Sequence, residues 1–156
     1  MKGIDNIGNT CFINSILQVL NNTDDLRQYM LSNNYNTSLF EYFNKNKKNL
    51  PKNYELYKNL LLNIQKIFIT LNSNEYEVSK HVKDMCICLH NLAKNGDSLA
   101  LGISDFSIHN DAEEFLTFIL DKIEDYSIDN NFKININTIA VKNLNLKYEN
   151  KNIIIN

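Results

Sequence analysis

Apolar residues recur at the spacing of an α-helix in four long segments, and this repeat restricts the fold more than any other feature of the sequence. Residues three and four positions apart lie on the same face of a helix. The segments cover residues 11–20, 54–71, 79–94 and 110–125. A shorter helix is predicted over residues 23–30, since Asp24 and Asp25 would complement the dipole in its first turn. The first 125 residues are therefore predicted to be helical.

Capping residues predict where these helices begin and end. Ser79 is expected to cap the helix that follows it, and the dipeptide Asn95-Gly96 to end that helix. Asn110 is expected to cap the last helix, with Glu113 completing a capping-box-like pair. Residues 32–51 are polar and rich in turn-forming residues, so we expect a loop there, and a linker is expected after Gly96.

The apolar repeat changes to a period of two beyond Asn131, which is typical of β-strands. The alternating or apolar segments cover residues 132–136, 144–148 and 153–155. A chain of 156 residues has the length of one domain with a sizeable core. We therefore predict a single α+β domain, mainly α, with residues 1–125 as its helical part and short strands in residues 132–156.

Composition excludes several classes of function. The net charge is -2 and the lysines are scattered, whereas nucleic-acid binding requires a basic face. No apolar run approaches the roughly 20 residues of a membrane helix. The three cysteines lack the paired spacing of a disulfide framework or a zinc site, so we expect no metal, no cofactor, and a cytoplasmic or nuclear protein.

Cys11 is the candidate nucleophile. A helix N-terminus carries unpaired N–H groups that stabilise a thiolate, and Cys11 begins the first predicted helix. A helical wheel places it with the polar residues of that helix, away from the apolar face. The preceding residues 3–10 contain two glycines and two asparagines, which permit tight turns and offer side-chain amides. Without further signals, the same pattern also describes an ordinary helix start.

Two segments resemble motifs of the ubiquitin-specific proteases. Residues 3–20, GIDNIGNTCFINSILQVL, resemble the cysteine box of that family over almost its whole length. Residues 108–116, IHNDAEEFL, resemble the downstream helix motif, which usually begins with two glutamines followed by Asp-Ala. Two motifs in the same order, separated by helical segments, make coincidence improbable. The resemblance implies the helical, thumb-like half of a papain-like cysteine peptidase domain, followed by a few strands of an incomplete sheet.

The resemblance also implies roles for four residues. Cys11 is expected to attack the carbonyl carbon of the terminal glycine of ubiquitin, and the Asn6 side chain to stabilise the oxyanion. Asp111 is expected to face the basic tail of ubiquitin, although an aspartate there also complements a helix dipole. His109 replaces a glutamine of the family motif and is expected to bind substrate. An alternative is that His109 activates Cys11, which requires hydrogen-bond contact.

The base that the family uses comes from a later segment, and no histidine follows His109 in this sequence. Three hypotheses remain open. The chain is an incomplete deubiquitinase whose palm-like half lies on a longer or separate chain, or it is a catalytically inactive pseudo-protease that binds ubiquitin, or it is a fragment without function. In the first two, the partner is ubiquitin or a ubiquitinated protein.

Overall fold

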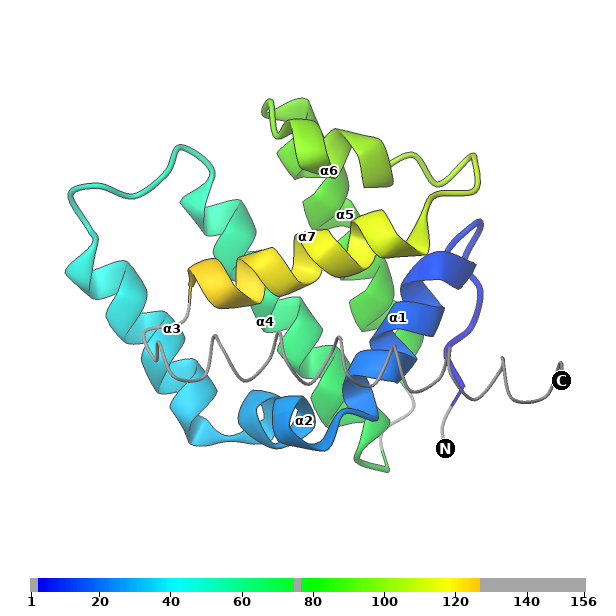
Figure 1. Ribbon diagram of the computed structural model, residues 1–156, viewed down its shortest axis with the longest axis horizontal. Helices are drawn as coiled ribbons and strands as arrows, with labels where there is room; N and C mark the ends of the chain where they lie inside the picture. Colours follow the sequence, from blue (N-terminus) through cyan, green and yellow to red (C-terminus); the bar gives the residue numbers. More distant parts are fainter. Residues whose placement is uncertain (1–2, 75–76, 127–156) are drawn as a thin grey trace, which may run out of the picture.

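The structure is a computed structural model that describes residues 3–74 and 77–126, and within these residues the chain forms seven α-helices (Figure 1). The helices are α1 (Cys11–Asn21), α2 (Asp24–Leu31), α3 (Asn33–Lys45), α4 (Tyr54–Leu71), α5 (Val78–Lys94), α6 (Ser98–Ile103) and α7 (Ala112–Asp125). The prediction of a mainly helical chain is confirmed for this part. The strands predicted in residues 132–156 lie outside the described residues.

The core lies between a central pair of helices and the two helices that carry the sequence motifs. Figure 1 shows α4 beside α5, with α7 running across both and α1 packed against α7. Each of these helices contributes fully buried apolar side chains at spacings of three or four residues. They include Ile13 and Leu17, Ile64 and Phe68, Met85 and Leu89, and Phe115 and Ile119. The apolar repeat read from the sequence is therefore the repeat that forms the core.

The prediction of a loop over residues 32–51 is wrong, because most of this segment forms α3. Its buried side chains, Tyr35, Leu39 and Phe43, occur once per turn in a segment whose other residues are mostly polar. The Tyr35 hydroxyl donates a hydrogen bond to the carbonyl oxygen of Leu61 at 3.2 Å. A narrow apolar stripe is a weak signal in sequence, and packing against the core stabilises the helix.

Several helix starts differ from the predicted ones by one or two residues. α5 begins after Glu77, so Ser79 lies inside its first turn. Asp111, not Asn110, caps α7, and its carboxylate accepts a hydrogen bond from the Glu113 amide at 2.6 Å. The predicted linker after Gly96 contains α6, whose first amides are capped by Asp97. The predicted end of α5 is confirmed, and Gly96 has the positive φ of a helix-ending glycine.

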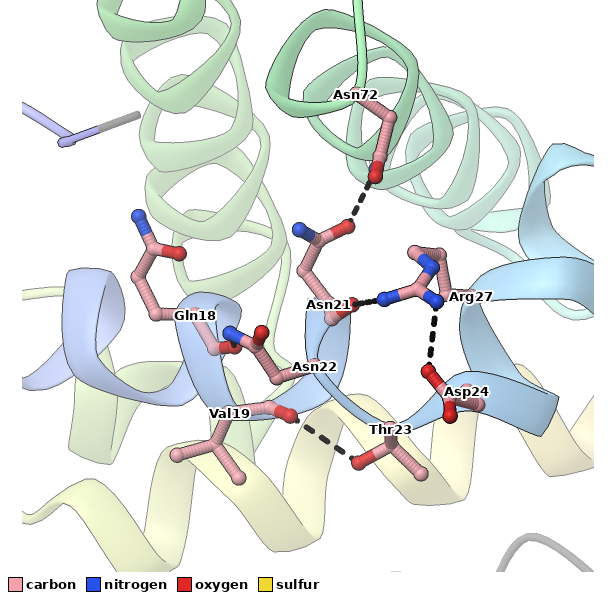
Figure 2. Close-up of polar contacts among 8 residues, drawn as sticks. All are labelled: Gln18, Val19, Asn21, Asn22, Thr23, Asp24, Arg27 and Asn72. Carbon is pink, nitrogen blue, oxygen red and sulfur yellow. Dashed lines mark hydrogen bonds and ion pairs between the residues drawn. The ribbon is translucent and has the colours of Figure 1, made fainter. Parts of the chain in front are cut away.

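A polar junction joins the carboxyl end of α1 to α2 and α4 (Figure 2). The Asn72 amide donates to Asn21 Oδ1 at 2.7 Å, which links α4 to α1. Arg27 donates to the carbonyl oxygen of Asn21 at 3.2 Å and to Asp24 Oδ1 at 2.6 Å. These bonds satisfy groups at a helix end that lack partners within the helix. They hold the end of α1 that is opposite to Cys11.

A second polar contact connects α4 to the start of α6. The Tyr57 hydroxyl donates to Asp97 Oδ2 at 2.5 Å, while Asp97 Oδ1 accepts from the amides of Leu99 and Ala100 at 3.0 Å each. Partial burial acts to raise the pKa of Asp97, but these hydrogen bonds and the nearby Lys122 ammonium outweigh it, so the pKa lies below its usual value. Ionised Asp97 therefore stabilises the fold.

Replacing Tyr57 by phenylalanine is expected to lower the free energy of unfolding by about 1 to 2 kcal/mol at pH 7, because a partly buried carboxylate loses a donor. Since the folded-state pKa of Asp97 is lowered, its contribution is complete above the unfolded pKa of about 3.9 and is lost as pH falls below it. The cost of Tyr57→Phe, measured by urea denaturation, should therefore shrink between pH 7 and pH 3.

The matched control is Tyr42→Phe, because the Tyr42 hydroxyl has no hydrogen bond among the described residues. Its unfolding free energy should stay within about 0.5 kcal/mol of the wild type at both pH values. An equal cost of Tyr57→Phe at pH 7 and pH 3 would contradict the assignment of the effect to ionised Asp97.

Candidate functional site

Cys11 is the first residue of α1, and its side chain is exposed, whereas Cys86 and Cys88 are buried on α5. The predicted exposure of Cys11 is confirmed. Thr10 precedes it in the capping position, but the Thr10 side chain makes no capping hydrogen bond, and the first turn contains no acidic residue. The amino end of α1 therefore presents its N–H groups without a competing side-chain oxygen from Thr10 or a nearby carboxylate, an arrangement that favours an anion.

Thr10 instead uses its side chain to orient Asn6. Its hydroxyl accepts a hydrogen bond from the Ile7 amide at 3.1 Å and donates to Asn6 Oδ1 at 3.0 Å, and its own amide donates to the same oxygen at 3.1 Å. A backbone N–H requires an acceptor, so the atom of Asn6 that faces it is the oxygen. The side chain is exposed, and its NH₂ group makes no hydrogen bond among the described residues. Such a group can only donate, as oxyanion stabilisation requires.

The cysteine loop, residues 3–10, is anchored to the body of the protein at three places. The buried Asn14 amide donates to the carbonyl oxygens of Ile4 and Asp5 at 3.4 and 3.1 Å. The Ser79 hydroxyl, from α5, donates to Asp5 Oδ2 at 2.9 Å. The Asn9 amide donates to the carbonyl oxygen of Phe106 at 3.3 Å, in the segment between α6 and α7. The position of Asn6 therefore depends on residues far away in the sequence.

Sequence reasoning missed these anchors. Asn14 belongs to the polar residues of α1, which the helical wheel groups with Cys11, and Ser79 was expected to cap α5, but both side chains hold the cysteine loop. The only signal for Asn14 was an asparagine one turn after Cys11, and nothing in the sequence pointed from Ser79 to Asp5. Gly8 adopts a positive φ of 94°, which favours glycine at this turn and explains why one occurs there.

The second motif lies at the same end of the molecule as the first. The rings of Phe12, next to Cys11, and Phe115, in the first turns of α7, meet edge to face with centroids 5.7 Å apart. Asp111 caps α7, so the expectation that it complements a helix terminus agrees with its geometry, and its side chain remains exposed. His109 is exposed in the preceding loop, and no hydrogen bond among the described residues joins its ring to Cys11. The alternative of direct activation by His109 thus gains no support.

A groove of about 520 Å³ begins at Asp111 and follows α6 and α7. We call it the acidic groove, because four carboxylates line it, from Asp111, Glu113, Glu114 and Asp121. Leu99 and Phe118 supply apolar surface, and no lysine or arginine among the residues that the structure describes lines the groove. Residues 114, 117, 118 and 121 lie on one face of α7, so helical spacing could have revealed most of this wall. An acidic groove with apolar patches suits an extended segment that carries basic and apolar side chains.

Two further properties concern the described residues as a whole. None of their helices combines the length and hydrophobicity that a bilayer crossing requires. Their histidine, cysteine, aspartate and glutamate side chains form no group of three or more that could hold a metal ion.

Comparison with known proteins places the chain in a family. The family model of ubiquitin carboxyl-terminal hydrolase matches residues 2–154. Human ubiquitin carboxyl-terminal hydrolase 2 is 57% identical over 35 residues, which are 22% of this chain and 6% of that protein. Ubiquitin carboxyl-terminal hydrolases 15 and 4 of the rat are each 49% identical over 37 residues, 24% of this chain and 4% of each relative. The matched segments thus span less than a tenth of each relative, and no solved structure matches the chain. Because the family model covers nearly the whole sequence, this chain belongs to the ubiquitin carboxyl-terminal hydrolase family.

Proposed function

We propose that residues 1–156 are part of a single thiol-dependent deubiquitinase domain and supply its nucleophile and its oxyanion donor. The supporting observation is the amino end of α1, where exposed Cys11 begins the helix and Asn6 uses its Oδ1 to bind Thr10, so its NH₂ group has no partner in the part of the chain that the structure describes. The family membership supports the same reaction class. Cys86 and Cys88 are no rivals for the role, because both are buried.

The proposed reaction proceeds through a thioester. The Cys11 thiolate attacks the carbonyl carbon of the terminal glycine of ubiquitin, and the carbonyl oxygen becomes an oxyanion that accepts a hydrogen bond from Asn6. When the carbonyl re-forms, the bond to the substrate nitrogen breaks and the amine leaves with a proton. Water then attacks the thioester, which releases the carboxylate of ubiquitin and regenerates the thiol.

The acidic groove is the proposed path of the ubiquitin tail. The tail is basic, and the groove presents four carboxylates beside the apolar side chains of Leu99 and Phe118. Asp111 stands at the end of the groove that is nearest to α1, since the Phe12–Phe115 contact brings the two helix starts together. The carboxylate of Asp111 caps α7 through Oδ1, which leaves Oδ2 for a cation. His109, next to this path, is proposed as a substrate contact.

The base that removes the thiol proton is proposed to come from a palm-like half outside this sequence. Among the described residues, no histidine is hydrogen-bonded to Cys11. Without such a base, general acid–base assistance worth about a hundred- to ten-thousandfold in rate is missing. The second candidate function, a pseudo-protease that binds ubiquitin without cleaving it, rests on the same fact. The groove serves both functions, so activity must separate them. The cytoplasmic or nuclear location stays a prediction.

The test uses ubiquitin that carries an electrophile at its C-terminus. The wild-type chain is expected to form a covalent adduct slowly, because the exposed Cys11 thiol is present but the proposed base is not, and Cys11→Ala is expected to form none. Asp111→Lys is expected to slow labelling about tenfold or more, because it reverses a charge in the acidic groove. Adduct formation is followed by intact-mass spectrometry.

The matched control is Asp25→Lys, which makes the same charge change at the start of α2, away from the acidic groove. Labelling of this variant should equal that of the wild type. Binding of ubiquitin without labelling, weakened by Asp111→Lys, would replace the enzyme proposal by the pseudo-protease. If the chain neither forms the adduct nor binds ubiquitin, the enzyme proposal and the pseudo-protease proposal are both refuted.

A further inference from the structure

A second cleft, of about 480 Å³, lies between α5 and the cysteine loop, and we call it the α5 cleft. One wall is a single face of α5, formed by Lys83, Cys86, Ile87 and His90, which follow one another at helical spacing. The facing wall consists of Ile7 and Thr10, from the cysteine loop, and Phe106. None of these lining residues borders the acidic groove.

The α5 cleft has an apolar interior and a basic rim. Ile87 lies in the middle of the α5 wall and is 50% exposed, so it supplies apolar surface to the cleft. Lys83 lies one turn before it and His90 about one turn after it, and no aspartate or glutamate of residues 3–74 and 77–126 lines the cleft. Lys83 forms no salt bridge among the described residues. Asp84, the nearest acidic residue along α5, lines a different groove.

An apolar cleft whose only charged groups are basic is complementary to an apolar molecule with an acidic end. The volume lies within the range of small-molecule sites, roughly 300 to 1,000 Å³. We propose that the α5 cleft binds a small aliphatic carboxylate of the medium-chain fatty acid class. The hydrocarbon chain packs against Ile87, Phe106 and Ile7, and the carboxylate pairs with the Lys83 ammonium. The acidic groove repels such a ligand, which limits binding to the α5 cleft.

The position of the cleft couples its occupancy to the cysteine loop. Thr10, which orients Asn6 through two hydrogen bonds, lines the cleft. So does Phe106, whose carbonyl oxygen accepts from Asn9 and forms one of the three anchors of the loop. A ligand that contacts both walls adds packing to a loop that is held by a few hydrogen bonds and by the contacts of Ile4 and Ile7 with the core. Octanoate is therefore expected to slow hydrogen exchange at the Ile7 amide. This inference concerns binding and does not depend on catalysis by Cys11.

The experiment titrates the 156-residue chain with octanoate below its micellar concentration and follows backbone and methyl resonances by NMR. Saturable shifts are expected for Ile7, Ile87 and Phe106, with none at Asp121 in the acidic groove. Octan-1-ol, which has the same chain without the charge, should bind at least about fivefold more weakly. No shifts at these three residues, or equal binding of the alcohol, would overturn the proposal.

Charge reversal in the cleft provides the second readout. Lys83→Glu is expected to weaken octanoate binding about tenfold or more, whereas the matched control Lys94→Glu, on the same helix but outside the cleft, should bind as the wild type does. Both lysines are exposed, so both variants should fold. If Lys83→Glu does not fold, the neutral variant Lys83→Gln is measured in its place. Unchanged affinity in both Lys83 variants would exclude the proposed carboxylate site.

Discussion

Iodoacetamide is expected to modify Cys11 and neither of the other two cysteines of the folded chain. Cys11 is exposed, whereas Cys86 and Cys88 are 7% and 9% exposed. Burial raises the pKa of the Cys86 thiol to about 12, so at pH 8 only about one molecule in ten thousand carries the reactive thiolate. Burial also raises the pKa of Cys88, against the opposing effect of its hydrogen bond from Asn63. Peptide mapping by mass spectrometry should find a single modified site.

Replacing Cys11 by alanine is expected to lower the rate of native modification about a hundredfold, since only molecules that open locally then expose a thiol. Cys88→Ala, as the control, should keep the adduct at Cys11. Full modification of all three cysteines should return in concentrated guanidinium chloride. Modification of Cys86 at the rate of Cys11 in the folded chain would show that the described packing of α5 is incorrect.

Phe115→Ala is expected to destabilise the protein by about 3 to 5 kcal/mol, a large fraction of the roughly 5 to 15 kcal/mol that holds a domain together. Phe115 is fully buried and its ring meets Phe12 edge to face. Removing the ring leaves a cavity between α1 and α7, which carry the two motifs. Urea denaturation followed by far-ultraviolet circular dichroism measures the loss. Labelling by the ubiquitin electrophile should fall as well, because Asp111 is no longer held near Cys11.

The control for this substitution is Phe40→Ala, because Phe40 is 67% exposed on α3. Its unfolding free energy should remain within about 0.5 kcal/mol of the wild type. Phe115→Leu keeps most of the buried volume, so it should lower the free energy of unfolding by less than half as much as Phe115→Ala does. A loss of under 1 kcal/mol for Phe115→Ala would mean that α7 does not pack on α1 as described.

The helices that the sequence revealed are those with wide apolar faces. The boundaries of α4 were predicted without error, because apolar residues fill its inner face from Leu56 to Leu71. α3 was missed, since three buried side chains in a polar segment carry too little signal without knowledge of their partners. The error at Ser79 has another cause: a serine near a helix start predicts a cap, but here its hydroxyl bonds to Asp5, which no local rule anticipates.

Some features of the candidate site could also be predicted from the sequence, and others could not. Exposure of Cys11 followed from helical periodicity, and the two motifs were identified by resemblance, whereas their contact through Phe12 and Phe115 was not predicted. The orientation of the Asn6 amide did not follow from either, because it depends on a buried threonine whose side chain bonds backward along the loop instead of forward into α1. The acidic groove was anticipated only at Asp111. Its other wall comes from α6, in a segment that the sequence suggested to be a linker.

The anchoring of the cysteine loop limits how far this protein could be shortened. A synthetic peptide of residues 1–31 would contain the whole first motif, including Asn6, Thr10 and Asn14, but neither Ser79 nor the carbonyl group of Phe106. In such a peptide the thiol would survive, while two of the three restraints on the turn before it would be gone. The arrangement of donors around that sulfur is thus a property of the assembled helices, and it should vanish at the same denaturant concentration at which the whole core unfolds.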